Sequence, residues 1–162
     1  MGEDWTDSVL RSLAAVVPGV DAAPYQVTAR VSRLALYISR RQEEAFGRFG
    51  LNRGDVGVLS ALRIAGPPNQ LSPTQLFKGL MLSSAGITSR LDRLEKRGLV
   101  RRIRHPNDRR GVIVELTDEG RSVLDQAVQA NTSTERELVQ GLDAAEAREL
   151  AALLKKMLAA LE

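Results

Sequence analysis

The chain lacks cysteine altogether, which excludes disulfides, thiolate zinc sites, thiol redox sensing and cysteine nucleophiles. It has a single histidine, His105, so an imidazole metal site would have no second ligand of its kind. No apolar run approaches the roughly 18 residues that a membrane span needs, and the N-terminus is acidic where a secretory signal is basic. These absences predict a cytoplasmic protein with no metal, no cofactor and no membrane contact.

Signatures of catalysis are also missing. The sequence has no glycine-rich phosphate loop, no cluster of metal ligands, and no combination of serine, histidine and aspartate beyond chance. With 43% hydrophobic and 27% charged residues in 162, the composition fits one folded domain with an appended interface. We therefore expect no catalytic residues and a function in binding, and the chain is not predicted to be an enzyme.

Positive charge is concentrated in the middle of the chain. Residues 78–110 hold ten lysines and arginines against three acidic residues, whereas residues 111–162 hold five against ten. A segment of net charge +7 followed by one of −5 lets a molecule present one face to a polyanion and keep the rest away from it. A basic helix face that is merely solvated is the alternative interpretation.

Apolar residues recur at helical spacing in several segments of the chain. Ser72-Pro73, Thr117 and Asp143 are signals for the start of a helix, and Gly50 and Gly98 are natural helix ends. We therefore predict helices over 26–49, 53–65, 72–80, 83–97, 118–138 and 143–161, with the GPPNQ stretch at 66–70 as a turn.

The residue pattern changes after Gly98. The segments LVRRIRH and GVIVELT alternate or contain β-branched residues, and PNDRR between them contains turn formers, so this region predicts a β-hairpin. The helices over 72–80 and 83–97 are only a few residues apart and can cross as a helix-turn-helix, with the hairpin as its wing. The expected fold is therefore mainly α, a winged helix-turn-helix.

The start of the helix over 83–97 is suited to the major groove of DNA, which admits one helix and is read by side-chain donors and acceptors. Arg90 and Arg93 flank this surface and can reach phosphates or guanine, whereas Asp92 and Glu95 are expected to tether neighbouring arginines. N-capping is the alternative role of the serines. The small residues expected to approach the bases are Ser83, Ser84, Gly86, Thr88 and Ser89.

Residues 83–120, SSAGITSRLDRLEKRGLVRRIRHPNDRRGVIVELTDEG, resemble the signature of MarR-type regulators. That signature reads T-x-R-L-D-R-L-E-x-x-G-L-V-x-R, then P-x-D-R-R and a closing L-T-x-x-G. The resemblance extends over about residues 26–161 and implies a wing arginine in the minor groove, where narrow A·T-rich DNA concentrates negative potential. Arg109 and Arg110 are the candidates, with Asp108 pinning one of them. A solvated hairpin tip is the alternative.

The resemblance also implies an obligate homodimer on a palindromic operator in double-stranded DNA, with half-sites about 10 base pairs apart. The helix over 26–49 and the stripe from Leu150 to Leu161 are more apolar than one winged helix could cover, although a purely intramolecular core is the alternative. The expected parts are an N-terminal extension or extra helix (1–25), a dimerisation helix (26–50), the winged-helix lobe (51–118) and C-terminal dimerisation helices (119–162).

Within the family, the sequence resembles a subgroup that responds to urate or related anions and carries a tryptophan on an extra N-terminal helix. Trp5, Arg90 and Arg102 match its tryptophan and arginines and predict a site for a small aromatic anion, with helix packing as the alternative role of Trp5. Gly57 replaces that subgroup's aspartate, which argues against urate, and Asp55 is expected to point elsewhere. The predicted function is a ligand-released repressor, and the alternative is a ligand-indifferent or non-specific architectural DNA-binding protein.

Overall fold

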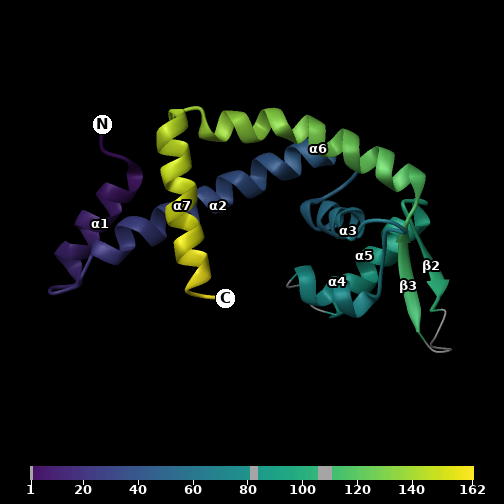
Figure 1. The fold of residues 1–162 in the computed structure, drawn as a ribbon. Coiled ribbons are helices and arrows are strands. Elements are labelled where there is room, and N and C mark those ends of the chain that lie inside the picture. The colour runs from purple at the N-terminus through teal and green to yellow at the C-terminus, as the bar shows by residue number, and fades with distance from the viewer. Residues whose placement is uncertain (1, 81–83, 106–110) are drawn as a thin grey trace. The chain divides into compact units, whose positions relative to one another are not determined.

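The computed structural model describes residues 2–80, 84–105 and 111–162, without the side chains of residues 84 and 85. The chain divides into two compact units, residues 1–41 and residues 42–162. The first unit contains α1 (Trp5–Val16), which falls within the expected N-terminal extension. Helix α2 (Ala23–Gly47) begins in the first unit and ends in the second (Figure 1), so the predicted long helix is confirmed with its ends shifted by two or three residues.

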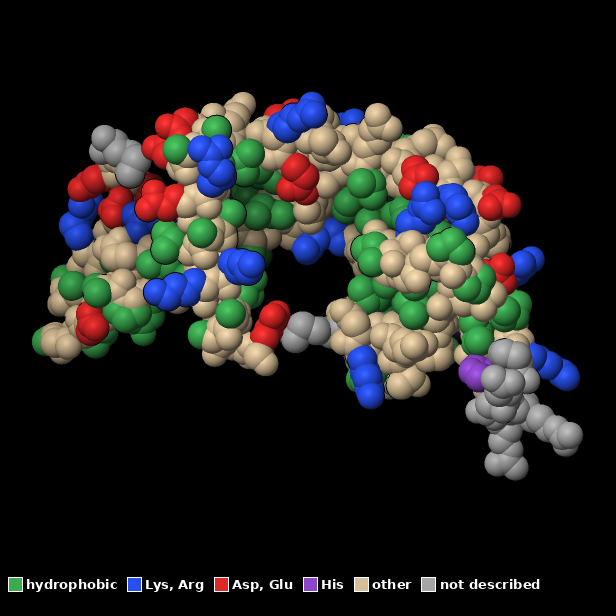
Figure 2. Space-filling view, viewed as in Figure 1, with side chains coloured by type: hydrophobic (Ala, Val, Ile, Leu, Met, Phe, Trp, Pro, Cys, Tyr) green, Lys and Arg blue, Asp and Glu red, His purple; other side chains and the backbone are tan. Residues whose placement is uncertain are grey.

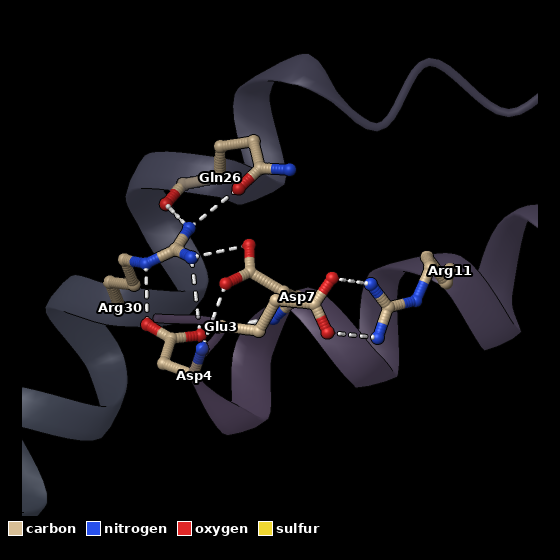
Figure 3. A network of polar contacts seen from close by, with 6 residues as sticks. All are labelled: Glu3, Asp4, Asp7, Arg11, Gln26 and Arg30. Atoms are coloured by element: carbon tan, nitrogen blue, oxygen red, sulfur yellow. Dashed lines mark hydrogen bonds and ion pairs between the residues drawn. The ribbon is translucent and has the colours of Figure 1, made fainter. Parts of the chain in front are cut away.

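Helix α1 is held on α2 by charged side chains (Figure 3). Asp4 caps α1, and the backbone N–H groups of Asp4 and Asp7 each donate to the other residue's carboxylate, at 2.9 and 3.0 Å. Arg30 of α2 donates to both carboxylates, at 2.8 Å to Asp4 and 2.7 Å to Asp7. An ion pair between Arg11 and Glu3 lies beside this network. One arginine shared by two carboxylates therefore ties the first turn of α1 to α2.

The second unit contains a winged helix-turn-helix followed by two further helices (Figure 1). Thr117 and Asp143 cap helices as predicted, and Gly98, with a φ of 71°, follows the end of a third. The cap of α3 is Asn52, which forms a capping box with Asp55. The elements are α3 (Arg53–Ile64), β1 (Gln70–Leu71), α4 (Pro73–Leu80), α5 (Ser84–Lys96), β2 (Val100–Arg104), β3 (Val112–Leu116), α6 (Asp118–Val139) and α7 (Ala144–Ala159).

The strands form one antiparallel sheet in the order β1-β3-β2. Strands β2 and β3 are the predicted hairpin, with Ile103 opposite Ile113. Strand β1 differs from the prediction, because the turn expected over 66–70 leads into a strand that places Leu71 opposite Val114. Two residues are too few to show an alternating pattern in the sequence.

The core of the second unit includes one face of α5. Ile87, Leu91 and Leu94 of this helix are at most 2% exposed, which confirms the apolar stripe predicted for it. They belong to one cluster with buried side chains of α3, α4 and the sheet, which include Leu59, Leu62, Leu76, Val100, Val114 and Leu116. Because this face packs into the core, the directions in which the other faces of α5 project are fixed as well.

Helix α7 contributes no buried residue within the single chain. Leu153 and Leu158 are 54% and 56% exposed, and Leu150 and Met157 are also exposed. Figure 2 shows hydrophobic side chains at the surface where α7 lies in Figure 1. The apolar stripe predicted near the C-terminus is therefore present but uncovered.

The docking of α1 is expected to depend on pH and on Arg30. Backbone hydrogen bonds within the cap, and then Arg30, lower the pKa of Asp4 and of Asp7, while Arg11 lowers the pKa of Glu3. Because the pKa of these carboxylates is lowered in the docked state, their negative charges stabilise docking at pH values above the usual carboxylate pKa. This stabilisation is lost as the pH falls through the lowered pKa values. Acrylamide quenching of Trp5, the only tryptophan, should therefore be constant from about pH 8 to 5 and rise below about pH 4.

In Arg30→Gln, the same quenching should already be high at pH 7, because the shared cation is gone. Arg136→Gln, which removes an equal charge from α6, is the matched control and should behave as the wild type does. Equal quenching of Trp5 in Arg30→Gln and the wild type at pH 7 would contradict this account of the docking.

Candidate nucleic-acid interface

The polar side of α5 forms a shallow depression. It is lined by Thr88, Ser89, Asp92, Arg93 and Lys96, all of them exposed. Hydroxyl groups can donate or accept hydrogen bonds, and the two cations supply further donors, which is the chemistry that contacts base edges and phosphates. The structure thus brings together three of the residues predicted to contact DNA, and half-buried Gly86 lies one turn earlier on the same helix.

Arginines follow a second side of α5. Arg90 and Arg93 are three residues apart, which places them on one side of the helix, and Arg97 follows directly after its last residue. Nη1 of Arg90 donates to Oδ1 of Asn52 at 2.6 Å, and Arg97 donates to the backbone oxygens of residues 49 and 50. This side of α5 is therefore attached to the segment that leads into α3.

The carboxylate of Asp55 lies between two of these arginines, and its side chain is 2% exposed. Its Oδ1 is 2.5 Å from Nη2 of Arg93 and 3.5 Å from Nη1 of Arg90, while its Oδ2 accepts from the backbone N–H of Asn52 at 3.1 Å. As expected, Asp55 points to another side of α3 than Gly57, where an added Cβ would meet Leu80. The capping box at Asn52 directs the carboxylate of Asp55 toward Arg90. Arg90 and Arg93, predicted to contact DNA, both have an intramolecular partner.

Arg102 of β2 is engaged from a different side of α5. Its guanidinium lies 2.5 Å from both Asp92 and Glu95, and its backbone N–H donates to Glu95 at 2.9 Å. Burial lowers the pKa of Arg102, but the hydrogen bonds to both carboxylates outweigh burial, so the pKa is raised. The prediction that Asp92 and Glu95 tether a neighbouring arginine is confirmed. Because positions 90 and 92 project from nearly opposite sides of a helix, Arg90 and Arg102 are held on different sides of α5.

Trp5, the third residue predicted for the anion site, belongs to the first unit. Trp5 is 58% exposed, and the guanidinium carbon of Arg33 lies 4.4 Å from the centroid of its ring, a cation–π contact. The same guanidinium lies 5.5 Å from the centroid of Tyr37. This contact agrees with the alternative role of Trp5, the packing of the extra helix.

The wing is described only at its base. The backbone N–H of His105 donates to the backbone oxygen of Gly111 at 3.0 Å, and Arg101 donates to Glu115 at 2.7 and 3.1 Å. This pair lowers the pKa of Glu115 and raises that of Arg101. The residues Ser83, Asp108, Arg109 and Arg110, together with the side chain of Ser84, lie outside the described residues, so their roles stay predictions.

Asn52 and the contacts of Asp55, which attach α5 to the start of α3, were not predicted from the sequence. Asn52 followed three residues later by Asp55 is a capping signal that the sequence contains, but its link to Arg90 joins positions 38 residues apart. Within 2–80, 84–105 and 111–162, no three histidine or acidic residues are grouped to hold a metal ion. In the same part of the chain, no helix has the length and apolar character to cross a membrane.

Comparisons with known proteins agree with this geometry. Residues 49–111 match a model of the MarR family. The HTH-type transcriptional regulator PecS of Dickeya dadantii (strain 3937) is 35% identical over 140 residues, covering 86% of this chain and 84% of PecS. A crystal structure of a mutant MarR from E. coli, complexed with operator DNA, has a TM-score of 0.75 and 30% identity, covering 85% of this chain and 96% of that one.

A third comparison concerns regulation. The structure of BpsR from Bordetella bronchiseptica, described as showing how 6-hydroxynicotinic acid regulates DNA binding, has a TM-score of 0.73 and 26% identity. The similarity covers 87% of this chain and 97% of BpsR. The three proteins are thus similar to both units of the chain rather than to one motif.

Proposed function

This chain belongs to the MarR family of transcriptional regulators, and on that premise we propose that it is a homodimeric repressor that binds a palindromic operator and is released by a small aromatic anion. The depression on α5 carries the proposal, because it offers hydroxyl groups and cations on a helix followed by a hairpin. In this arrangement α5 lies in the major groove and the wing in the adjacent minor groove. The structure of a mutant MarR from E. coli complexed with operator DNA supports operator binding by this fold.

Operator preference distinguishes this function from that of a non-specific architectural protein. Selection from random DNA should yield a palindrome, and the protein should bind it about a thousandfold or more tighter than scrambled DNA at fixed salt. Equal affinity for both DNAs would favour the architectural alternative. Reporter transcription that falls when the operator is occupied would support repression rather than activation.

The wing arginines should contribute to this affinity. Replacing both Arg109 and Arg110 by alanine is expected to weaken operator binding by about 2–4 kcal/mol, because two cations leave the minor groove. The measurement is a titration of labelled operator at physiological salt, with dimer mass and melting unchanged. Arg136→Ala combined with Arg148→Ala removes the same charge from α6 and α7 and is the control. Unchanged affinity of the wing variant would remove the wing from the mechanism.

The homodimer is supported by apolar surface that the single chain leaves uncovered. Helix α7 has no buried residue, and Val31, Leu34 and Tyr37 of α2 are also exposed. A second copy of the chain would bury these side chains, and this burial would stabilise the dimer by about 25 cal/mol for each Å² of apolar area. The two copies of α5 in the dimer would then lie in successive major grooves of a palindromic operator.

Charged residues on α7 should therefore prevent assembly. Replacing Leu154 and Leu158 by glutamate places unpaired charge in the apolar stripe and should give monomers or unfolded chains. Sedimentation equilibrium measures the mass, and circular dichroism measures folding. Replacing Lys155 and Lys156 by glutamine changes the net charge equally and should leave a dimer. A folded dimer of the leucine variant would place the interface elsewhere.

The inducer is proposed to be a small aromatic anion at the site predicted from Trp5, Arg90 and Arg102, and it would contact one of the two arginines, because these are held on different sides of α5. Regulation of BpsR by 6-hydroxynicotinic acid supports this class of ligand. An anion would have to compete with Asp55 for Arg90, or with Asp92 for Arg102, so binding would alter the attachments of α5. Ligand binding of this kind shifts an equilibrium only by the difference in affinity for the two states.

Titration with salicylate-like compounds, urate and other purines should reveal that inducer. An effective ligand should change Trp5 fluorescence and release labelled operator over one concentration range, with a coupling of about 1–3 kcal/mol. Urate should bind weakly, and Gly57→Asp should improve it if Leu80, 3.3 Å from an added Cβ, gives way. Tight urate binding by the wild type would contradict the argument from Gly57. An unchanged ligand response after Trp5→Phe would remove Trp5 from the site.

A further inference from the structure

We propose that Asp55 is a specificity-determining residue for operator recognition, because its carboxylate keeps two arginines of α5 from gaining phosphate contacts. This role depends on the proposed function, which is operator binding through α5. Asp55 lies in α3 and acts through Arg90 and Arg93, so it is a positioning residue. Its effect is on the ratio of specific to non-specific binding rather than on binding strength alone.

Both arginines meet Asp55 at the same oxygen. The distances from its Oδ1 are 2.5 Å to Nη2 of Arg93 and 3.5 Å to Nη1 of Arg90. The side chain of Asp55 is 2% exposed, that of Arg90 is 18% exposed and that of Arg93 is 45% exposed. A carboxylate so deeply buried requires compensating cations, and these are the two that the fold provides. Arg90 is thus withdrawn into the protein, while Arg93 keeps part of its guanidinium in solvent.

Gly54 makes room for the withdrawn arginine. A Cβ added at Gly54 would overlap the guanidinium of Arg90, whose terminal nitrogens lie against the first turn of α3. Nη1 of Arg90 donates to Asn52 at 2.6 Å, whereas its buried Nε finds no hydrogen-bond partner among the described residues. Among the described residues, Arg90 is therefore held at the end of its guanidinium by acceptors of Asn52 and Asp55. The guanidinium fits there because Gly54 has no side chain.

The charge of Asp55 affects specificity because phosphates carry no sequence information. An arginine that reaches a phosphate strengthens binding to every DNA sequence, whereas contacts to base edges strengthen binding to one. Arg93 lines the depression on α5, so its guanidinium is close to the surface proposed to face DNA. Loss of the buried charge would release Arg93 and Arg90 toward phosphates and would also loosen the attachment that orients α5.

Asp55→Asn tests this role directly, because asparagine keeps an oxygen that can accept from Asn52 but removes the charge. The probes are the operator duplex selected by the wild type and a scrambled duplex of equal length and composition. We expect affinity for scrambled DNA to rise and the operator-to-scrambled ratio to fall by about tenfold or more. For scrambled DNA, the slope of log affinity against log salt should steepen by about one for each arginine released. Asp125→Asn, which removes an equal charge from α6, is the control.

Gly54→Ala is a second test that leaves the net charge unchanged. Alanine is favourable in a helix, so α3 should persist while Arg90 is displaced from its position. The ratio should again fall. Gly47→Ala is the matched control, because an added Cβ there has no neighbour within 4 Å among the described residues.

The outcomes separate this role from a structural one and from the proposed function. If Asp55→Asn lowers affinity for both duplexes in parallel with its melting temperature, and Gly54→Ala leaves the ratio within twofold of wild type, Asp55 is merely structural and the proposal is overturned. A folded Asp55→Asn protein with the wild-type ratio and salt slope overturns it as well. A wild type with no operator preference would overturn the proposed function together with this role.

Discussion

The orientation of α5 depends first on the burial of its apolar stripe. Ile87, Leu91 and Leu94 are almost completely buried, and each such side chain stabilises the fold by about 1.5–3 kcal/mol. Exposed ion pairs contribute about 0–1 kcal/mol each, and the attraction in a buried pair such as that of Asp55 is largely offset by desolvation, so the core supplies most of the stability of this region. The polar contacts have a different effect: they attach two sides of this buried helix to the start of α3 and to β2.

Contacts within the protein reduce the positive charge that residues 78–110 can present to DNA. Counting residues between 78 and 110 suggests a large surplus of cations for a polyanion. Five arginines in that range, however, contact oxygens of the protein itself: Arg90, Arg93, Arg97, Arg101 and Arg102. A count of charges along a sequence therefore overstates the electrostatic attraction that a folded surface can exert, because intramolecular partners neutralise part of it.

Local signals explain why much of the fold could be predicted. Thr117, Asp143 and Gly98 act within one helical turn, and the stripe of α5 repeats every three or four residues, so each is visible in a short window. Strand β1 and the partners of Arg90 could not be found in this way, because they depend on residues far away in the sequence. Likewise, the small residues of the interface were identified by type, but the engagement of Arg90 by Asp55 required the tertiary structure.

The short strand β1 has a consequence for behaviour in concentrated solution. In the described residues, β3 is the middle strand of the sheet. Its edges are β1, of two residues, and β2, which carries Arg101, Arg102 and Arg104. An unprotected edge offers unpaired backbone groups to strands of other molecules, whereas a very short edge or charged side chains along an edge discourage such pairing. The wing sheet is therefore poorly suited to edge-to-edge aggregation, which favours solubility when the protein is abundant and not bound to DNA.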